Sequence, residues 1–319
     1  MSKIRNLRVL TILTAAVLAA LTMALVAPSS EAREKPDLVV TSAQLTSPNV
    51  VFSGEQSTFT FTDTTKNKGD AVARSSTTVL KLNETDEAPG LLEGLTEASR
   101  DVPKLKPGKQ NKGQGSGTHY LSRNLIGSYY AFVCADPANL VKESNEGNNC
   151  KRIGVMSIIP KSWRGTVNGS AVVKPGVTET WTAQDMTFAF DSYSAPYFDY
   201  TASGDVNYSI SGTDDEGCEW SGSGTVTVQN LGQLRLHQSL TTYEGLAMVT
   251  PPVYTITKSC PNGGNSTQDG PGSSTWLHTG APSPTIANPF GVTTLAGSYT
   301  SPVTPSGQSV HWEWNLEAP

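Results

Sequence analysis

The sequence predicts an all-β protein: an immunoglobulin-like antiparallel β-sandwich followed by a second, larger β-sandwich or barrel. Short runs rich in β-branched and aromatic residues recur along the chain, and Gly, Pro, Asn and Asp turns separate them. Beyond the N-terminal leader, these runs lack the 3.6-residue apolar period of a helix. With 319 residues, of which 37% are hydrophobic and 16% charged, the chain can bury two cores and is too apolar for a disordered protein.

The N-terminus has the features of an export signal. Three basic residues precede the uncharged run Val9 to Val26, and Ser30-Glu31-Ala32 fits a signal-peptidase site. We therefore expect residues 1–32 to be a signal peptide and the protein to be extracellular, either secreted or cell-surface associated. The alternative is a retained membrane anchor, because 18 apolar residues are at the lower limit of a bilayer span. No second apolar run follows, so we expect no membrane insertion after the leader is removed.

The composition changes sharply near Pro160-Lys161. Residues 33–159 contain 15 basic and 14 acidic side chains, whereas residues 160–319 contain 5 and 13 and also hold all six tryptophans. This shift predicts a domain boundary, with an immunoglobulin-like domain at 33–159 and a Trp-rich acidic domain at 160–319. The chain has no basic excess, which argues against a nucleic-acid partner.

The four cysteines follow the same division. Cys134 and Cys150 lie in the first part, and Cys218 and Cys260 lie in the second. An even number of cysteines in an exported chain predicts disulfides, and pairing within each domain is the simplest of the three connectivities. A metal site is the competing interpretation, but no Cys-x-x-Cys or Cys/His cluster has zinc spacing.

The first domain shows short candidate strands, and its sequence blocks resemble a known family. The strands lie at residues 37–40, 58–62, 77–82, 119–121, 129–134 and 153–159. The blocks Pro36 to Val40, Asn67-Lys68-Gly69, Leu105 to Gly108 and Gly127 to Asp136 resemble, in order and spacing, the CARDB family, the cell-adhesion-related domain of bacteria. The Asn- and Glu-rich stretch from Asp136 to Cys150 is similar to the hairpin joining that family's last two strands. The resemblance covers residues 36–158 and implies an immunoglobulin-like sandwich in an extracellular setting.

Two polar stretches of the first domain allow a structural or a functional interpretation. Asp136, Glu143, Asn145 and Glu146 offer the hard oxygen ligands that calcium prefers, although their spacing is not that of an EF-hand. We expect these side chains to hold a polar turn, with calcium as the alternative cofactor. The basic residues Arg100, Lys104, Lys106, Lys109 and Lys112 could contact an anionic polymer. The glycines from Gly113 to Gly117 favour a solvated loop and strand edge instead.

The second domain alternates apolar and polar residues around Phe188, Tyr208 and Trp312. This period-2 alternation predicts strands with one face on a core, and it places Trp312 and Trp314 on the buried face. Aromatic residues outside this pattern are the candidates for a ligand-binding surface. They are Tyr193, Tyr197, Phe198 and Tyr200, predicted to lie on a loop that exposes an aromatic patch, and Trp276 in a polar stretch.

No catalytic motif is present: the sequence contains no G-x-S-x-G elbow, H-E-x-x-H motif, P-loop or Rossmann fingerprint. We therefore predict a non-catalytic binding or adhesion protein that recognises a cell-surface protein or polysaccharide. The alternatives are carbohydrate recognition by the C-terminal domain, a structural role in the envelope, and an enzyme whose site is assembled only by folding.

Overall fold

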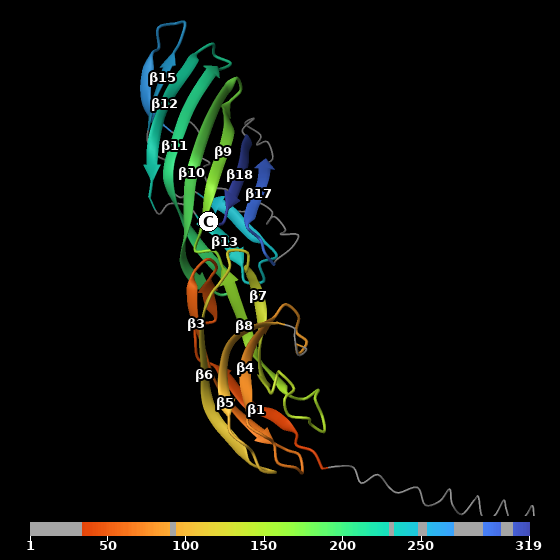
Figure 1. Ribbon diagram of the computed structural model, residues 1–319. Coiled ribbons are helices and arrows are strands. Elements are labelled where there is room, and N and C mark those ends of the chain that lie inside the picture. The colour runs from red at the N-terminus through yellow and green to blue at the C-terminus, as the bar shows by residue number, and fades with distance from the viewer. Residues whose placement is uncertain (1–33, 90–93, 230–232, 248–253, 271–289, 301–308) are drawn as a thin grey trace, which may run out of the picture.

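The computed structural model describes residues 34–89, 94–229, 233–247, 254–270, 290–300 and 309–319. The signal-peptide prediction lies outside these ranges. Within them the regular secondary structure is entirely β, and none of it is a helix able to cross a membrane. The strands form two sheets that lie end to end in an elongated molecule (Figure 1).

By the first and second domains we denote the described residues up to Ile159 and from Ser162 on, which build the two sheets. Eight strands form the first sheet. They are β1 (Leu38–Leu45), β2 (Val50–Phe52), β3 (Gln56–Asn67), β4 (Ser76–Asn83), β5 (Leu95–Val102), β6 (Gln110–Tyr120), β7 (Gly127–Ala135) and β8 (Cys150–Ile159). Hydrogen bonds connect them in the order β1-β3-β6-β5-β4-β7-β8-β2. Within the described ranges, β5 and β6 share a single backbone bridge pair, Ser99 with Ser116, and β1 packs against β7 and β8. The strands therefore form two layers, which confirms the predicted sandwich. One pair departs from the antiparallel pattern, because β2 runs parallel to β8.

The prediction of a solvated loop and strand edge holds for Lys104, Lys106 and Lys109, which are exposed between β5 and β6. It is wrong for the glycines and for Arg100. Residues 110–117 belong to the strand β6, and Gly115 lies directly opposite Phe61 of β3. A Cβ on Gly115 would lie 2.3 Å from Cε1 of Phe61, so the glycine makes room for a buried ring. Arg100 is buried and pairs with Asp63, with Nη2 2.8 Å from Oδ2. The glycines gave the stretch a loop-like composition, but Gly115 makes room for a core ring and Arg100 is buried with its partner.

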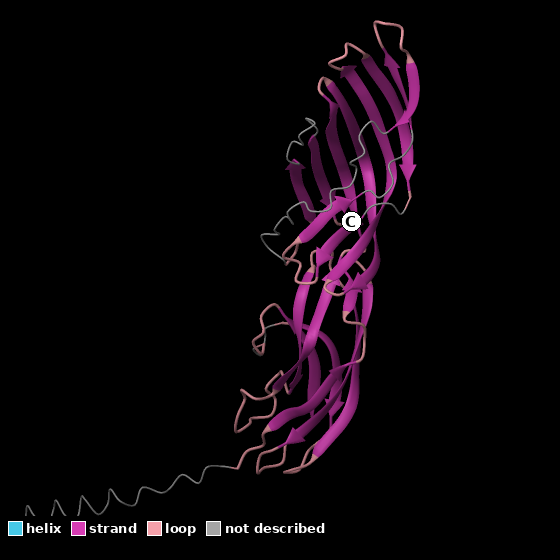
Figure 2. Cartoon of the chain, turned by 180° about the vertical axis from the view of Figure 1, so that it is seen from behind, coloured by secondary structure: helices cyan, strands magenta, loops and turns pink. Residues whose placement is uncertain are grey.

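Ten strands form the second domain. They are β9 (Ser162–Lys174), β10 (Val177–Ser194), β11 (Tyr197–Thr213), β12 (Glu219–Val228), β13 (Gln233–His237), β14 (Tyr243–Ala247), β15 (Tyr254–Ser259), β16 (Ser266–Gly270), β17 (Thr294–Thr300) and β18 (Ser309–Glu317). The main path is β16-β15-β12-β11-β10-β9-β18-β17, and β13 and β14 extend from β11. The strands build one strongly curved antiparallel sheet (Figure 2). This half-barrel is closer to the barrel alternative than to a second sandwich.

The predicted alternation sets the buried face of the second sheet. Trp163, Trp181 and Trp312 lie in its core, and the rings of Trp181 and Trp312 meet edge-on at 4.8 Å. Trp312 is 4% exposed, as the alternation predicts, whereas Trp314 is half-buried. Opposite Trp181 lies Gly169, where a Cβ would approach the indole to 2.3 Å. Aromatic rings packed over glycines therefore build this core.

Each domain contains one disulfide, as the simplest connectivity predicts. Cys134 of β7 is the cross-strand neighbour of Cys150 of β8, and their sulfurs are 2.07 Å apart. The sulfurs of Cys218 and Cys260 are 2.02 Å apart, and this bridge joins the start of β12 to the end of β15. No free cysteine is found among the described residues.

The two sheets meet at Pro160 and Lys161, between β8 and β9. The hydroxyl of Tyr200 donates to the Pro160 carbonyl at 2.9 Å, and the rings of Phe52 and Phe190 pack edge-on across the junction at 5.3 Å. Side chains of the first domain thereby extend the core of the second.

Candidate functional site

The aromatic stretch Tyr193 to Tyr200 is a β-hairpin, and the loop prediction for it is wrong. Ser194 of β10 pairs directly with Tyr197 of β11. Phe198 and Tyr200 are fully buried in the core of the second domain, so neither can form part of an exposed ligand surface. Tyr193 is 38% exposed and Tyr197 is half-buried. Only these two rings of the predicted patch can meet a ligand at the surface.

The two accessible rings flank the turn after β13. The Tyr193 hydroxyl donates to Oε1 of Gln238 at 2.8 Å, and the ring of Tyr197 meets the imidazole of His237 edge-on at 5.6 Å. The guanidinium of Arg235 lies 5.0 Å from the centre of the Tyr197 ring. The hairpin therefore braces this turn and fixes the side chains of His237 and Gln238.

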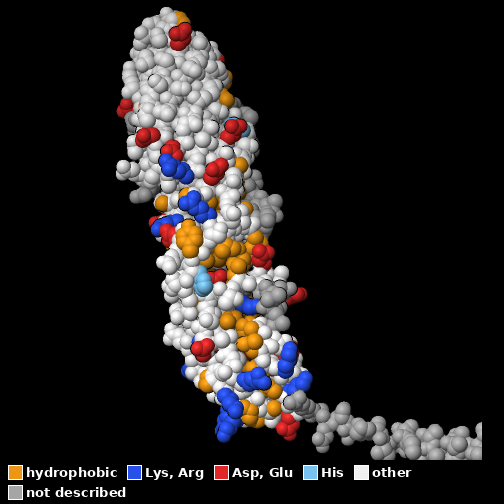
Figure 3. Space-filling view, in the orientation of Figure 1, with side chains coloured by type: hydrophobic (Ala, Val, Ile, Leu, Met, Phe, Trp, Pro, Cys, Tyr) orange, Lys and Arg blue, Asp and Glu red, His pale blue; other side chains and the backbone are white. Residues whose placement is uncertain are grey.

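A pocket of about 420 Å³ opens beside this turn, where the two domains meet. The first domain lines it with Ser128, Tyr130 and Val155, and the second domain with His237, Gln238 and Phe290. Figure 3 shows hydrophobic side chains gathered around this middle part of the molecule. Pockets between domains that combine aromatic walls with a few polar groups are typical ligand sites.

Direct contacts between the domains fix the pocket walls. Oγ of Ser128 donates to the Gln238 carbonyl at 2.5 Å, and the amide of Gly291 donates to the Ile126 carbonyl at 2.7 Å. The rings of Tyr129 and Phe290 pack at 5.3 Å. Because these contacts join segments more than 100 residues apart in the sequence, sequence reasoning missed Ser128, Tyr130 and Phe290.

The polar groups of the pocket are of mixed character. Nδ1 of His237 lies 3.2 Å from the Ser239 amide and 2.7 Å from the Ser239 hydroxyl. The carboxylate of Glu84 also lines the pocket. The guanidinium of Arg152 lies 4.7 Å from the centre of the Tyr130 ring. The site offers donors, acceptors and ring faces, with little net charge.

The candidate calcium ligands serve the backbone of the connection between β7 and β8. Oδ2 of Asp136 accepts the amide of Val141 at 2.7 Å. Oε2 of Glu143 accepts the amide of Leu38, and its Oε1 accepts the side-chain amide of Asn149 at 3.2 Å. These bonds support the interpretation of a polar turn.

The remaining candidate ligands make similar local bonds. Oε1 of Glu146 accepts the amide of Glu143 at 2.9 Å, and Oδ1 of Asn145 accepts the amide of Gly147 at 3.0 Å. Burial, reinforced by the carboxylates of Glu146, Asp136 and Asp37, raises the pKa of Glu143 to about 7. Among the described residues, these carboxylates do not form a set of three with oxygens within 4.8 Å. Calcium stays the untested alternative to the polar turn.

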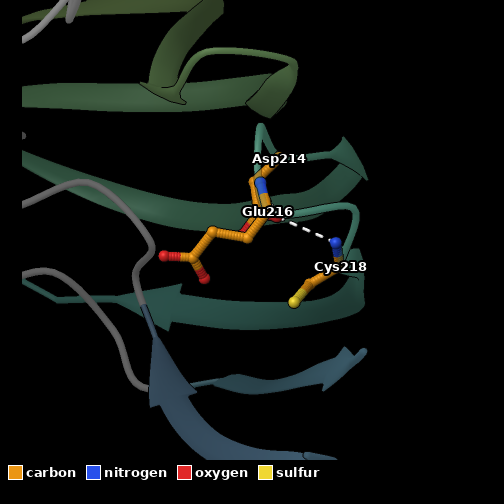
Figure 4. Close-up of side chains that lie close together, drawn as sticks. All are labelled: Asp214, Glu216 and Cys218. Atoms are coloured by element: carbon orange, nitrogen blue, oxygen red, sulfur yellow. Dashed lines mark hydrogen bonds between the residues drawn. The ribbon is translucent and has the colours of Figure 1, made fainter. Parts of the chain in front are cut away.

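Asp214, Glu216 and Cys218 lie close enough together to suggest a metal site (Figure 4). The sulfur of Cys218 is consumed by its disulfide with Cys260. Oδ1 of Asp214 accepts the amide of Cys218 at 2.9 Å, and Oδ2 accepts the indole N–H of Trp220 at 2.9 Å. The bond from Trp220 lowers the pKa of Asp214 to about 2. The cluster is therefore a hydrogen-bonded turn that supports the disulfide.

The last predicted site residue, Trp276, lies outside the described residues. Its proposed contact with a ligand stays a prediction. No residue by which the first domain lines the pocket was among the predicted site residues.

Comparisons with known proteins concern the first domain. The model of the CARDB family matches residues 35–152. The crystal structure of the CARDB domain of the PF1109 protein from Pyrococcus furiosus, in complex with di-metal ions, is 21% identical. It covers 39% of this chain and 89% of that chain, with a TM-score of 0.26. Among curated proteins, none matches the chain.

A second solved structure is a domain of a Methanosarcina acetivorans protein that is described as a cell surface protein. It is 24% identical and covers 39% of this chain and 92% of that chain, with a TM-score of 0.26. The resemblance of the sequence blocks is confirmed, because the model of the CARDB family matches residues 35–152 of this chain.

Proposed function

We propose that this chain is an exported, non-catalytic binding or adhesion protein that acts at the cell surface or in the medium. The observation that carries the proposal is the junction pocket, because both domains contribute to a single aromatic-lined site. The two disulfides fit a protein that works in an oxidising compartment. The CARDB match to the first domain fits a surface-associated role.

Carbohydrate is the ligand class that the pocket favours. Tyr130 and Phe290 present half-buried ring faces, against which the C–H face of a sugar can stack. Gln238, Ser128 and His237 offer the donors and acceptors that sugar hydroxyls require. A structural role in the envelope is the alternative, and it needs no soluble ligand.

Calorimetric titration of the full chain with soluble oligosaccharides and cell-wall fragments tests the proposal. We expect saturable binding that Tyr130→Ala weakens at least tenfold. Tyr120→Ala is the matched control, because Tyr120 is 65% exposed in the same domain and does not line the pocket. Retention of the protein in a wall fraction without any soluble ligand would favour the structural role. Turnover of a bound saccharide would refute the non-catalytic assignment.

A further inference from the structure

The end of the first domain that lies farthest from the second domain is built around one buried asparagine. Oδ1 of Asn67 accepts the amides of Asp37 and Gly69 at 3.1 and 3.0 Å. Its Nδ2 donates to the carbonyls of Ala71 and Leu105 at 2.8 and 3.0 Å. Three segments distant in the sequence are thereby fixed side by side: the start of β1, the turn after β3 and the loop between β5 and β6. We call this end the distal tip.

Basic side chains dominate the surface of the distal tip. Its exposed basic residues are Lys35, Lys68, Arg74, Lys104, Lys106, Lys109 and Lys142, and the exposed acidic residues near them are Glu34, Asp70, Asp101 and Glu146. Figure 3 shows Lys and Arg side chains concentrated at this end, whereas Asp and Glu predominate on the second domain. The first domain is nearly neutral overall, so folding has separated its charges.

Two exposed aliphatic side chains lie within this basic surface. Leu140 is 68% exposed and Val72 is 44% exposed, and they are two of the four large hydrophobic side chains that are exposed in the described ranges. Both line a shallow pocket of about 410 Å³ together with Lys35, Arg74 and Lys142. Burying such residues in an apolar phase is favourable, so their exposure at one place marks an interaction surface.

We infer that the distal tip docks on the surface of an anionic phospholipid bilayer. Leu140 and Val72 would enter the headgroup region, while the surrounding lysine and arginine side chains contact lipid phosphates. The described part of the chain begins at this tip, and Glu34 lines the same pocket. An orientation with the tip toward a membrane therefore places the junction pocket and the second domain away from the membrane. The inference goes beyond the proposed binding function, which needs no lipid contact.

The aliphatic pair distinguishes a bilayer from a soluble polyanion. A soluble polyanion would satisfy the lysines through electrostatic attraction alone and would leave Leu140 in water. A bilayer surface satisfies both features at once, since basic residues and a hydrophobic contact act together in interfacial binding. We therefore choose the bilayer as the partner.

The inference is tested by measuring amide hydrogen exchange of the full chain in the presence of lipid vesicles. The vesicles contain either phosphatidylcholine alone or phosphatidylcholine with phosphatidylglycerol, so that any insertion of the leader is common to both. We expect amides at residues 68–74 and 140–142 to exchange at least tenfold more slowly on the anionic vesicles. The double variant Arg74→Glu with Lys142→Glu should abolish this difference, and Leu140→Ser should reduce it. Arg123→Glu with Lys174→Glu is the control, because it makes the same charge change at exposed sites away from the tip.

The other outcomes contradict the inference. Equal exchange on the two kinds of vesicle would exclude an anionic membrane surface as the partner. If soluble inorganic polyphosphate at the same phosphate concentration slowed exchange at these amides as much as the anionic vesicles do, the tip would be assigned to soluble polyanions. Saccharide binding at the junction pocket is measured separately, so failure of the tip inference leaves the proposed function standing, and the reverse also holds.

Discussion

The two domains stabilise antiparallel strands by different means. The first folds its strands into two layers and buries charged groups between them, including the pair Asp63 and Arg100. The second keeps a single curved sheet and covers one face with large aromatic side chains, such as Trp181 and Trp312. The second domain also buries one carboxylate, that of Glu179, which accepts a hydrogen bond from the Tyr254 hydroxyl. The difference therefore lies in the main source of the core: paired layers in the first domain, and large rings over small residues in the second.

The largest effect should come from breaking the buried ion pair. Asp63→Ala leaves the guanidinium of Arg100 buried without its carboxylate, so we expect a loss of about 3–5 kcal/mol in the free energy of unfolding. Urea denaturation followed by far-UV circular dichroism measures this loss. The second domain offers a control in Arg164 and Asp185, which form a two-bonded pair that is largely exposed. Arg164→Ala should give no measurable change, and equal losses in the two variants would show that burial is not the cause.

For the disulfides we expect the larger loss of stability in the second domain, in contrast to the ion pairs. The bridge between Cys134 and Cys150 spans 16 residues, and the bridge between Cys218 and Cys260 spans 42. Loop-closure entropy predicts about 3 kcal/mol for the shorter loop and about 4 kcal/mol for the longer. Replacing each pair by serine tests this ranking. Tryptophan fluorescence reports on the second domain alone, because all six tryptophans lie there. A larger loss from the shorter loop would indicate that native packing outweighs chain entropy.

Sequence reasoning succeeded where one property decided the structure. Strict alternation predicted the buried face around Val310 and Trp312, and the division of the cysteines predicted both disulfides. It failed at residues 193–200, because a hairpin with aromatic rings on both faces has no period-2 signal. It also missed the junction pocket, since Tyr130 and Phe290 are brought together only by the docking of the two domains.

A smaller effect should come from a packing arrangement found in both domains, a glycine opposite a buried aromatic ring. Gly115 lies opposite Phe61 in the first domain, and Gly169 lies opposite Trp181 in the second; in each, an added Cβ would come within 2.3 Å of the ring. We expect Gly115→Ala and Gly169→Ala each to cost about 1–3 kcal/mol, because the packed rings must move. Chemical denaturation measures both losses. Gly264→Ala is the control, since nothing lies within 4 Å of its added Cβ. If the control lost as much stability, backbone effects rather than ring packing would be responsible.

The smallest expected effect is a difference between the domains in how their stability depends on pH. Burial raises the pKa of Glu143 from 4.5 to about 7, so the folded first domain binds this proton more tightly than the unfolded chain. Its stability should therefore rise as the pH falls from about 7 to about 4.5. Allowing for partial solvation of the carboxyl group, the gain is about 1 kcal/mol.

Asp214 of the second domain has the opposite sign. The hydrogen bond from the Trp220 indole lowers its pKa from 3.8 to about 2, so its contribution to stability is complete above pH 3.8 and is lost as the pH falls toward 2. Thermal unfolding should thus show a first domain that is more stable at pH 5 than at pH 7, whereas the contribution of Asp214 is the same at both. Glu143→Gln keeps the shape of the side chain and removes its titration, so it should reduce the gain of the first domain. An undiminished gain in that variant would assign the pH dependence to the other buried carboxyls whose pKa is raised, Glu97 and Asp136.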